Sequence, residues 1–374
     1  MNKVQLNKGL SIRRVALLDG LKKLHGAISG KTSIPMLTNV KIEVKEKEII
    51  LIGSDSDYTV FVALENDMNN TNDSYLVNYP SLVAFLKKVK SDEVVFNHLN
   101  DYAIEVTCNN INYTLESFNS ADYPSFVYHV ENEITLEKTV FEKAMKATLF
   151  ATAKSESRPV LRGLNVTINQ NGLEIISTDS HRLSKYVIPS IVSDEKKHVI
   201  IPADSLVKMQ KIIDKKCNQV FMSFDEKQSI FRFENVTCII RNIEGNYPET
   251  SRLIPDSFDT EIKLDTAEIT DILDVMSIVN KAEKYQAITL ELVEGNKVLL
   301  SAGAENTQKM KSTISPISHY GENLKICFNV SFLTDIIKNT SSDVLTFTFN
   351  GGLRPFTVTI DENNLHLILP IRIR

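Results

Sequence analysis

The stretch Ile200-Ile-Pro-Ala-Asp-Ser-Leu-Val-Lys-Met-Gln-Lys211 reads as a strand that leads directly into a helix. It has two counterparts, Val77-Asn-Tyr-Pro-Ser-Leu-Val-Ala-Phe-Leu-Lys87 and Cys327-Phe-Asn-Val-Ser-Phe-Leu-Thr-Asp-Ile-Ile337. Serines at the expected helix starts, Ser81, Ser205 and Ser331, are 124 and 126 residues apart. Each is a candidate N-cap whose hydroxyl accepts a hydrogen bond from an amide of the first turn. A unit that recurs at one interval predicts a repeated domain.

Two further landmarks share this spacing. The segments Gly53-Ser-Asp-Ser-Asp57, Ser177-Thr-Asp-Ser-His181 and Ser301-Ala-Gly-Ala-Glu305 each follow a strand-like run and begin 124 residues apart. Asp122-Tyr-Pro124 and Asn246-Tyr-Pro248 are also 124 residues apart, and proline disfavours helix at the residue before it. The 374 residues therefore divide into a first copy (1–127), a second copy (128–255) and a third copy (256–374).

Each copy is expected to contain two helices and about eight short strands. The opening helices are predicted at 12–27, 138–154 and 266–284, and the second helices at 81–90, 204–216 and 331–339. Helix and sheet each bury one apolar side, so both helices should pack on one face of an antiparallel sheet. The sequence thus predicts an α+β fold made of three repeated domains of antiparallel sheet with two helices each.

Composition points to a soluble protein without a cofactor. Hydrophobic residues make up 43% and charged residues 24%, and no apolar run is long enough to span a membrane. The N-terminus lacks an export signal, so we expect a cytoplasmic location and no membrane partner. The four cysteines, which lie far apart and without metal-ligand spacing, are expected to be reduced and buried: Cys108, Cys217, Cys238 and Cys327.

Charge is distributed unevenly. The net charge is -5, yet the six predicted helices hold 18 basic and 9 acidic residues, which leaves 24 basic and 38 acidic residues elsewhere. If all the helices face one way, they form a cationic face suited to phosphate contact. For a single helix, an ordinary solvated surface is the favoured explanation of its lysines, and it is the opposite sign of the remaining residues that favours a cationic face. The opening helix of the third copy is acidic, so its share of any DNA contact stays open.

Several motifs, in order along the whole chain, resemble those of the bacterial DNA sliding clamp family, the β subunit of DNA polymerase III. They are Ser33-Ile-Pro-Met-Leu37, Thr178-Asp-Ser-His-Arg-Leu183, Gly245-Asn-Tyr-Pro248 with Arg252, and Leu369-Pro-Ile-Arg372. The resemblance implies a head-to-tail homodimer whose six domains close a ring around duplex DNA. Such a ring is a replication processivity factor, slides without sequence preference and has no catalytic residues. Heterologous contacts between repeated units close a ring when the rotation permits it.

The resemblance also implies residues for DNA contact and for dimerisation. The DNA-contacting candidates are Lys31, Lys87, Lys154 and Lys211, with Lys154 at the end of an opening helix. The dimer candidates are Tyr113 and Leu115 on an edge strand of the first copy, and Ile278 and Val279 near the end of a third-copy helix. An exposed edge strand can pair with another chain. Burial inside the first copy is the alternative for Tyr113 and Leu115.

The partners implied are the replicative polymerase, the clamp loader and other proteins that carry short peptides with a glutamine and a leucine-phenylalanine-like ending. These peptides enter an apolar cleft between the second and third copies. Core packing is the alternative for Leu161, Leu183 and Leu253, and Phe332 stands where many members carry tyrosine. By position, the cleft comprises Leu161, Thr178, His181, Arg182, Leu183, Pro248, Arg252, Leu253, Phe332, Pro355, Leu367, Ile368, Leu369, Pro370, Ile371 and Arg372.

Three other interpretations concern a hydrolase, a metal site and an open scaffold. Asp179, Ser180 and His181 are the residue types of a hydrolase triad, but neighbouring residues of an extended segment point to opposite sides and cannot form its hydrogen-bonded chain. Asp55 and Asp57 could hold a metal, although two carboxylates in one turn are more often solvated. A repeated scaffold that binds proteins through the same cleft without encircling DNA is the remaining alternative.

Overall fold

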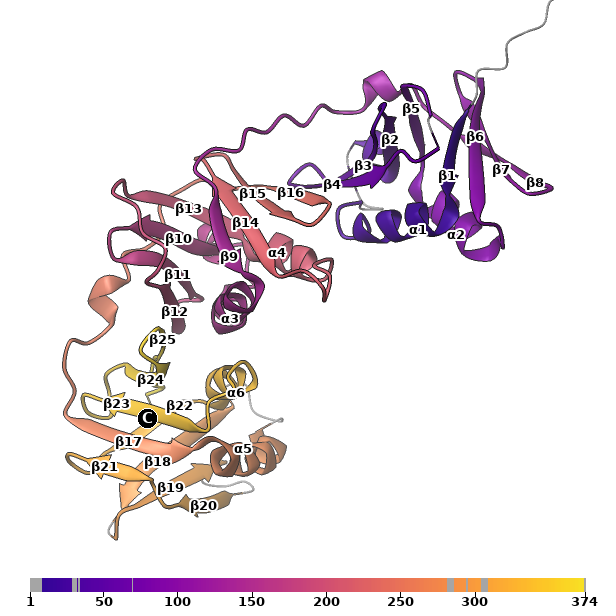
Figure 1. Cartoon of the computed structure of the whole chain (residues 1–374). Coiled ribbons are helices and arrows are strands. Elements are labelled where there is room, and N and C mark those ends of the chain that lie inside the picture. Colours follow the sequence, from indigo (N-terminus) through magenta and orange to yellow (C-terminus); the bar gives the residue numbers. More distant parts are fainter. Residues whose placement is uncertain are drawn as a thin grey trace, which may run out of the picture. The chain divides into compact units, whose positions relative to one another are not determined.

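A computed structural model describes residues 9–28, 32, 34–68, 70–280, 286–293, 295–303 and 309–372, and the side chains of 279 and 280 are not among the described ones. Over these residues the chain is α+β, with six α-helices and antiparallel sheets (Figure 1). No helix in this described part combines the length and the apolar character needed to cross a membrane. The chain forms two compact units. Unit 1 is Met1–Lys138 with Asp204–Asn242, and unit 2 is Thr139–Ala203 with Ile243–Arg374.

The strands alternate buried and solvent-facing side chains, as expected for sheets covered on one face. The first copy contains β1 (Leu10–Arg13), β2 (Asn39–Val44), β3 (Glu48–Ser54), β4 (Tyr58–Glu65), β5 (Asp73–Asn78), β6 (Glu93–Asn100), β7 (Ala103–Cys108) and β8 (Ile111–Glu116). The second contains β9 (Ile134–Glu137), β10 (Gly163–Asn169), β11 (Gly172–Thr178), β12 (Arg182–Ile188), β13 (Lys197–Pro202), β14 (Gln219–Phe224), β15 (Gln228–Phe233) and β16 (Val236–Arg241). The third contains β17 (Thr260–Asp265), β18 (Ala287–Val293), β19 (Lys297–Ala302), β20 (Met310–Ile314), β21 (Ser318–Tyr320), β22 (Lys325–Asn329), β23 (Val344–Phe349), β24 (Phe356–Asp361) and β25 (Asn364–Ile368).

Each copy contributes two groups of four adjacent strands, except that one group of the third copy has a fifth strand, β21, and neighbouring copies share a sheet. Unit 1 holds an eight-stranded sheet in the order β5-β2-β3-β4-β16-β15-β14-β9 and a four-stranded sheet β1-β6-β7-β8. Unit 2 holds a nine-stranded sheet β13-β10-β11-β12-β25-β24-β23-β17-β21 and a four-stranded sheet β20-β19-β18-β22. The second copy thus gives one group of four strands to each unit. The predicted threefold α+β architecture is confirmed, while the boundaries at 127 and 255 stay a prediction.

All six predicted helices are present, and those predicted at 12–27, 138–154 and 204–216 are shorter than expected. Those predicted at 81–90 and 331–339 keep their lengths but begin two and one residues earlier, and the predicted end at 281–284 lies outside the described residues. They are α1 (Arg14–Lys23), α2 (Tyr79–Lys88), α3 (Lys138–Thr148), α4 (Ala203–Gln210), α5 (Thr266–Asn280) and α6 (Val330–Lys338). Within unit 1, α1 packs against α2, and within unit 2, α5 packs against α6 (Figure 1). Apolar side chains at helical spacing bury one face of each, for example Leu333, Ile336 and Ile337 in α6.

The predicted serine N-caps are wrong. The side chain of Asn78 accepts from the Ser81 amide, and that of Asn329 accepts from the Ser331 amide, so both helices begin before the serine. In α4, Ser205 is likewise the third residue of the helix. An asparagine immediately before the first helical residue accepts a hydrogen bond from an otherwise unpaired amide of the first turn as well as a serine does. The spacing of the serines across the copies favoured the serines instead.

Candidate functional site

Two strand pairings join the copies, and they have the same register. We call the pairing of β4 with β16 the first junction and that of β12 with β25 the second junction. Tyr58 lies opposite Ile240 at the first, and Arg182 lies opposite Ile368 at the second. Two residues along, Val60 faces Cys238 and Ser184 faces His366. Tyr58 therefore occupies the same place as Arg182, and Cys238 the same place as His366.

An aspartate organises the turn that precedes each junction. The Asp55 carboxylate accepts from the amides of Asp57 and Tyr58, at 3.2 and 2.8 Å. The Asp179 carboxylate accepts from the amides of His181 and Arg182, at 3.0 and 3.1 Å. This confirms that the two segments are equivalent turns. The third segment, Ser301–Glu305, lies partly outside the described residues.

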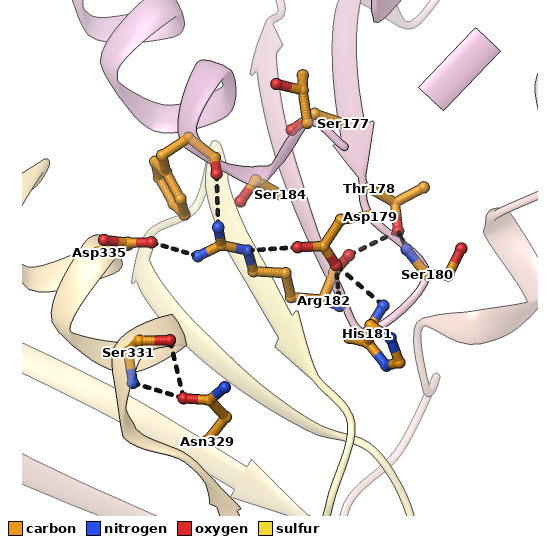
Figure 2. Close-up of polar contacts among 12 residues, drawn as sticks. Ser177, Thr178, Asp179, Ser180, His181, Arg182, Ser184, Asn329, Ser331 and Asp335 are labelled. Carbon is orange, nitrogen blue, oxygen red and sulfur yellow. Dashed lines mark hydrogen bonds and ion pairs between the residues drawn. The ribbon is translucent and has the colours of Figure 1, made fainter. Parts of the chain in front are cut away.

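Arg182 is the centre of the second junction. Its residue is only 8% exposed, and its guanidinium donates to three groups (Figure 2). Nε lies 3.0 Å from the Asp179 carboxylate and one terminal nitrogen 2.6 Å from the Asp335 carboxylate on α6. The other terminal nitrogen donates to the carbonyl of Phe150 at 2.7 Å. Asp179 is thus engaged with arginine and backbone amides, and it does not orient His181 as a triad would require.

Aromatic rings close around this arginine. Its guanidinium carbon lies 5.3 Å from the centre of the Phe150 ring and 4.7 Å from that of Phe332, distances at which a cation is attracted by a ring face. The buried His366 ring is 5.6 Å from Phe150, and its Nδ1 is 2.9 Å from the Ser184 hydroxyl oxygen. Burial, together with the positive charge of Arg182, lowers the pKa of His366 to about 3. His366 is therefore neutral at physiological pH.

The C-terminal tail packs beside this network, as its apolar composition predicted. The Leu369 amide donates to the carbonyl of His181 at 3.0 Å, and the Ile371 amide donates to the carbonyl of Cys327 at 2.7 Å. Ile176, Leu183 and Leu367 form a buried apolar cluster, against which lie the half-buried side chains of Tyr247, Ile254 and Leu369. The Tyr247 hydroxyl accepts from the Thr178 amide at 3.0 Å, while the Thr178 hydroxyl donates to the Arg182 carbonyl at 2.6 Å.

The structure divides the predicted cleft residues by exposure. Ile368 belongs to the buried core of the third copy, so its side chain is not exposed, and its place in the cleft stays a prediction. Core packing also holds for Leu161 and Leu183, and Leu367 is buried with them. Leu253, in contrast, is 48% exposed. The predicted residues with exposed or half-buried side chains are His181, Pro248, Arg252, Leu253, Phe332, Pro355, Leu369, Pro370, Ile371 and Arg372.

The lysines predicted to contact DNA have varied positions. Lys87 is exposed in the last turn of α2, and Lys211 is exposed just after α4. Lys154 does not end a helix, because α3 stops at Thr148 and a single 3-10 turn (Leu149–Ala151) follows it. Its exposed side chain lies in the next loop. Lys31 lies outside the described residues.

The positive charge of the helices is smaller than predicted. As observed, α1 to α4 carry 9 basic and 3 acidic residues, whereas α5 and α6 carry 1 basic and 4 acidic. Much of the predicted surplus lies in the segments that follow the helices, at Lys90, Lys154, Lys211, Lys215 and Lys216. A cationic helix surface is therefore a property of the first two copies.

The predicted dimer residues are only partly exposed. β8 is an edge strand of its sheet, as expected. Leu115 is 3% exposed, so for this residue burial inside its own unit holds. Tyr113 is half-buried, with its ring centre 5.1 Å from that of Phe85. Ile278, on α5, is 67% exposed, and the Val279 side chain lies outside the described ones.

Comparison with known proteins matches each copy to a domain of one family. The N-terminal, central and C-terminal domains of the DNA polymerase III beta subunit match residues 9–127, 135–249 and 251–372. The Beta sliding clamp of Staphylococcus aureus is 30% identical over 97% of this chain and 98% of its own length. The chain belongs to the bacterial sliding clamp family, the beta subunits of DNA polymerase III.

Solved structures of the family have the same fold. The DNA polymerase sliding clamp of Bacillus subtilis matches with a TM-score of 0.91 and 27% identity, over 97% of this chain and 99% of its own. The DNA polymerase III beta chain of Streptococcus pneumoniae matches with a TM-score of 0.90 and 28% identity, over the same shares of the two chains. Members of this family are processivity factors without catalytic activity, so the chain is not an enzyme.

Sequence reasoning missed several residues of the second junction. Asp335 and Phe150 contact Arg182, Tyr247 contacts Thr178, and His366 contacts Ser184 and Phe150, yet none of the four was named as a site residue, although Asp335 and Tyr247 lie within quoted segments. A signal for Asp335 was present, because it is the sixth residue of α6 just as Lys208 is the sixth residue of α4. Lys208 pairs with Asp55 at 2.7 Å, so aligning the copies residue by residue would have indicated a charged partner at this position.

Proposed function

We propose that two copies of this chain close head to tail into a ring that encircles duplex DNA, slides along it and tethers replication proteins. Membership of the sliding clamp family supports the role of processivity factor. The observation that carries closure is the pattern of junctions. Each copy joins the next through the pairing of two edge strands. Within the residues that the structure describes, the corresponding edge strands β20 and β8 pair only with β19 and β7 of their own sheets.

The repeats predict how these two edges pair. β20 corresponds to β4 and β12, because the first pair of each hairpin is equivalent. Met310 pairs with Ala302, as Thr59 pairs with Ser54 and Leu183 pairs with Thr178. β8 corresponds to β16 and β25, because each follows its neighbour through a two-residue turn. Extending the common register places Tyr113 of one subunit opposite Lys311 of the other, and Ile111 opposite Thr313. Exposed strand edges pair readily in this way.

A disulfide test follows from this register. In the Tyr113→Cys/Lys311→Cys variant, the new thiols should oxidise into a covalent ring of two subunits, since directly opposite residues of an antiparallel pair point to the same face. The native cysteines are buried and should not compete. Tyr113→Cys/Ser312→Cys is the matched control, because residue 312 points to the other face. Efficient cross-linking of the control but not of the 311 variant would refute the register.

The proposal keeps most of the residues predicted for the dimer and for DNA contact, but makes strand pairing the main dimer contact. The pairing of β8 with β20 is its main element, with Tyr113 at the centre and the exposed Ile278 beside it as an apolar contact. Lys87, Lys154 and Lys211 supply point charges to phosphates without reading bases. All three are exposed and form no ion pair within the residues that the structure describes. Lys31 stays a candidate by its position in the sequence.

The partner site that we propose is the surface formed by the exposed residues of the predicted cleft. Leu253, Phe332, Leu369 and Ile371 offer apolar area, and Leu369 packs against the buried Leu183 and Leu367. Leu161 is buried and stays a candidate by its position in the sequence. Apolar anchors supply desolvation energy while polar groups orient the peptide backbone. The partners are the replicative polymerase, the clamp loader and other proteins carrying short clamp-binding peptides, which meet the ring on DNA in the cytoplasm.

The alternative, a scaffold that never closes around DNA, makes a different prediction for solution size. The ring should elute as a dimer of about twice the 42.1 kDa subunit mass, with no larger species as its concentration rises. An open scaffold should elute as a monomer or as a concentration-dependent ladder. Deleting Leu369 to Arg374 should abolish peptide binding and leave this dimer intact.

A further inference from the structure

The two junctions seal the same strand pairing with different residues. At the first junction, Tyr58 is buried, with its hydroxyl 3.5 Å from the Cys238 sulfur, and Lys208 lies over its ring. At the second junction the equivalent places hold Arg182, His366 and Asp335. The common aspartate pairs with a lysine from α4 at the first junction and with the arginine itself at the second. The fold alone therefore does not require an arginine and an aspartate at 182 and 335.

The residues of the second junction also cost more free energy to bury than those of the first. An arginine taken out of water loses solvation that only good geometry and complete hydrogen bonding offset. Here two carboxylates, a carbonyl and two rings surround Arg182. A tyrosine at the equivalent place needs none of these partners, which argues that Arg182 and its partners serve something other than the junction.

At both junctions the residue before the central one holds the end of the partner strand, since the Asp57 carbonyl accepts the amide of Arg241 and the His181 carbonyl accepts the amide of Leu369. What differs is the segment held, which at the second junction is the C-terminal tail. Phe332, which stacks on Arg182, is one helical turn before Asp335 on α6. The arginine thus connects the turn at 178–182, the tail and α6, and all three carry residues of the proposed peptide site.

We propose that Asp335 is a positioning residue for peptide binding, which acts by holding Arg182 against Phe332 and so fixes the turn, the tail and α6 in the geometry that a clamp-binding peptide requires. This inference rests on the proposed function of the cleft. Asp335 is suited to this role because its carboxylate binds a terminal nitrogen of Arg182 at 2.6 Å while its side chain is still 39% exposed, at the edge of the network.

The test measures binding of a fluorescent peptide with a glutamine and a leucine-phenylalanine ending to the full-length dimer. Asp335→Asn should weaken binding roughly tenfold, the size expected when a network residue shifts a site it does not touch. Asp335→Glu should restore most of the affinity because it restores the charge. Asp343→Asn, at an exposed position of the same copy, should bind like the unmodified protein. A merely structural role would lower the thermal midpoint of Asp335→Asn and leave peptide affinity unchanged.

A triple variant, called the transplant below, separates a role in folding from a role in peptide binding more sharply. The triple variant Arg182→Tyr/Asp335→Lys/His366→Cys copies the first junction into the second, so it should fold and dimerise but lose peptide binding. Unchanged affinity in Asp335→Asn, or in a folded transplant, would overturn the positioning role. Absence of binding by the unmodified protein would instead overturn the proposed peptide site itself. If the transplant fails to fold, the comparison of Asn with Glu at 335 still decides.

Discussion

The first and second junctions have the same strand pairing and register but different side chains at equivalent positions. Both pair an edge strand of one copy with an edge strand of the next in the same register, below an equivalent aspartate turn. The first is closed by a tyrosine, a thiol and a lysine, and the second by an arginine, a histidine and an aspartate. The fold thus fixes where the side chains lie, and the local function determines which ones are used.

The largest expected difference concerns the central residue of the second junction. Arg182→Met removes the cation between Asp179 and Asp335, so that Asp179 keeps only its backbone amide donors and Asp335 loses its ion pair, which should cost about 3 kcal/mol of unfolding free energy. Urea denaturation followed by circular dichroism measures it. A loss no larger than that of Lys208→Met would show that the two junctions are energetically alike.

The second junction should also be the acid-sensitive one. His366 has a pKa lowered from 6.5 to about 3, so below pH 6.5 the unfolded chain binds a proton that the folded chain excludes. Its contribution to stability is therefore complete above pH 6.5 and declines as the pH falls toward 3. His366→Cys should show a smaller drop in urea midpoint between pH 7 and pH 5 than the unmodified protein. The exposed His129→Gln is the control, and an equal drop in His366→Cys contradicts the assignment.

The first junction should respond to alkali instead. Burial raises the pKa of the Cys238 thiol from 9.0 to about 12, so above pH 9 the unfolded chain loses a proton that the folded chain keeps. Stability should decline as the pH rises from 9, and the decline should be shallower in Cys238→Ala. Urea midpoints at pH 8 and pH 10 test this, with Cys217→Ala as a control at another buried cysteine. An equal fall of the urea midpoint between pH 8 and pH 10 in Cys238→Ala and Cys217→Ala would show that Cys238 does not make the first junction sensitive to alkali.

The smallest effect is expected for the lysine of the first junction. The Lys208 side chain is 37% exposed and its pair with Asp55 is a single contact, so Lys208→Met should change the unfolding free energy by no more than about 1 kcal/mol. The same denaturation assay measures it. A loss near that of Arg182→Met would mean that this ion pair, despite its exposure, holds the first junction together.

The sequence was sufficient for the threefold repeat and the fold class, because strand alternation, turn aspartates and helix starts recur at one interval. It misplaced the helix ends at Lys154 and the caps at Ser81 and Ser331, since local propensity does not reveal where tertiary packing stops a helix. It did not separate Ile368, whose side chain lies in the buried core, from its neighbour Leu369, whose side chain is half-buried, because alternate residues of an extended segment face opposite sides.

The network around Arg182 could not be read from sequence for a different reason. Asp335 is 153 residues from Arg182, and Phe150 and His366 belong to separate segments, so only the shared sheet brings them together. Alignment of α4 with α6 places Asp335 where Lys208 stands, but it does not identify the partner of Asp335. Pairing across copies follows from topology and from the register of the strands.

Ring closure is tested most directly by topology. The Tyr113→Cys/Lys311→Cys protein is oxidised in the presence of nicked circular DNA, and the mixture is separated by gel filtration in high salt, which screens the lysine contacts. Covalently closed dimers are expected to stay with the circular DNA and to leave it once a restriction enzyme cuts the circle. Protein that stays bound to the linear DNA in high salt, or that never remains with the circle, would contradict ring closure.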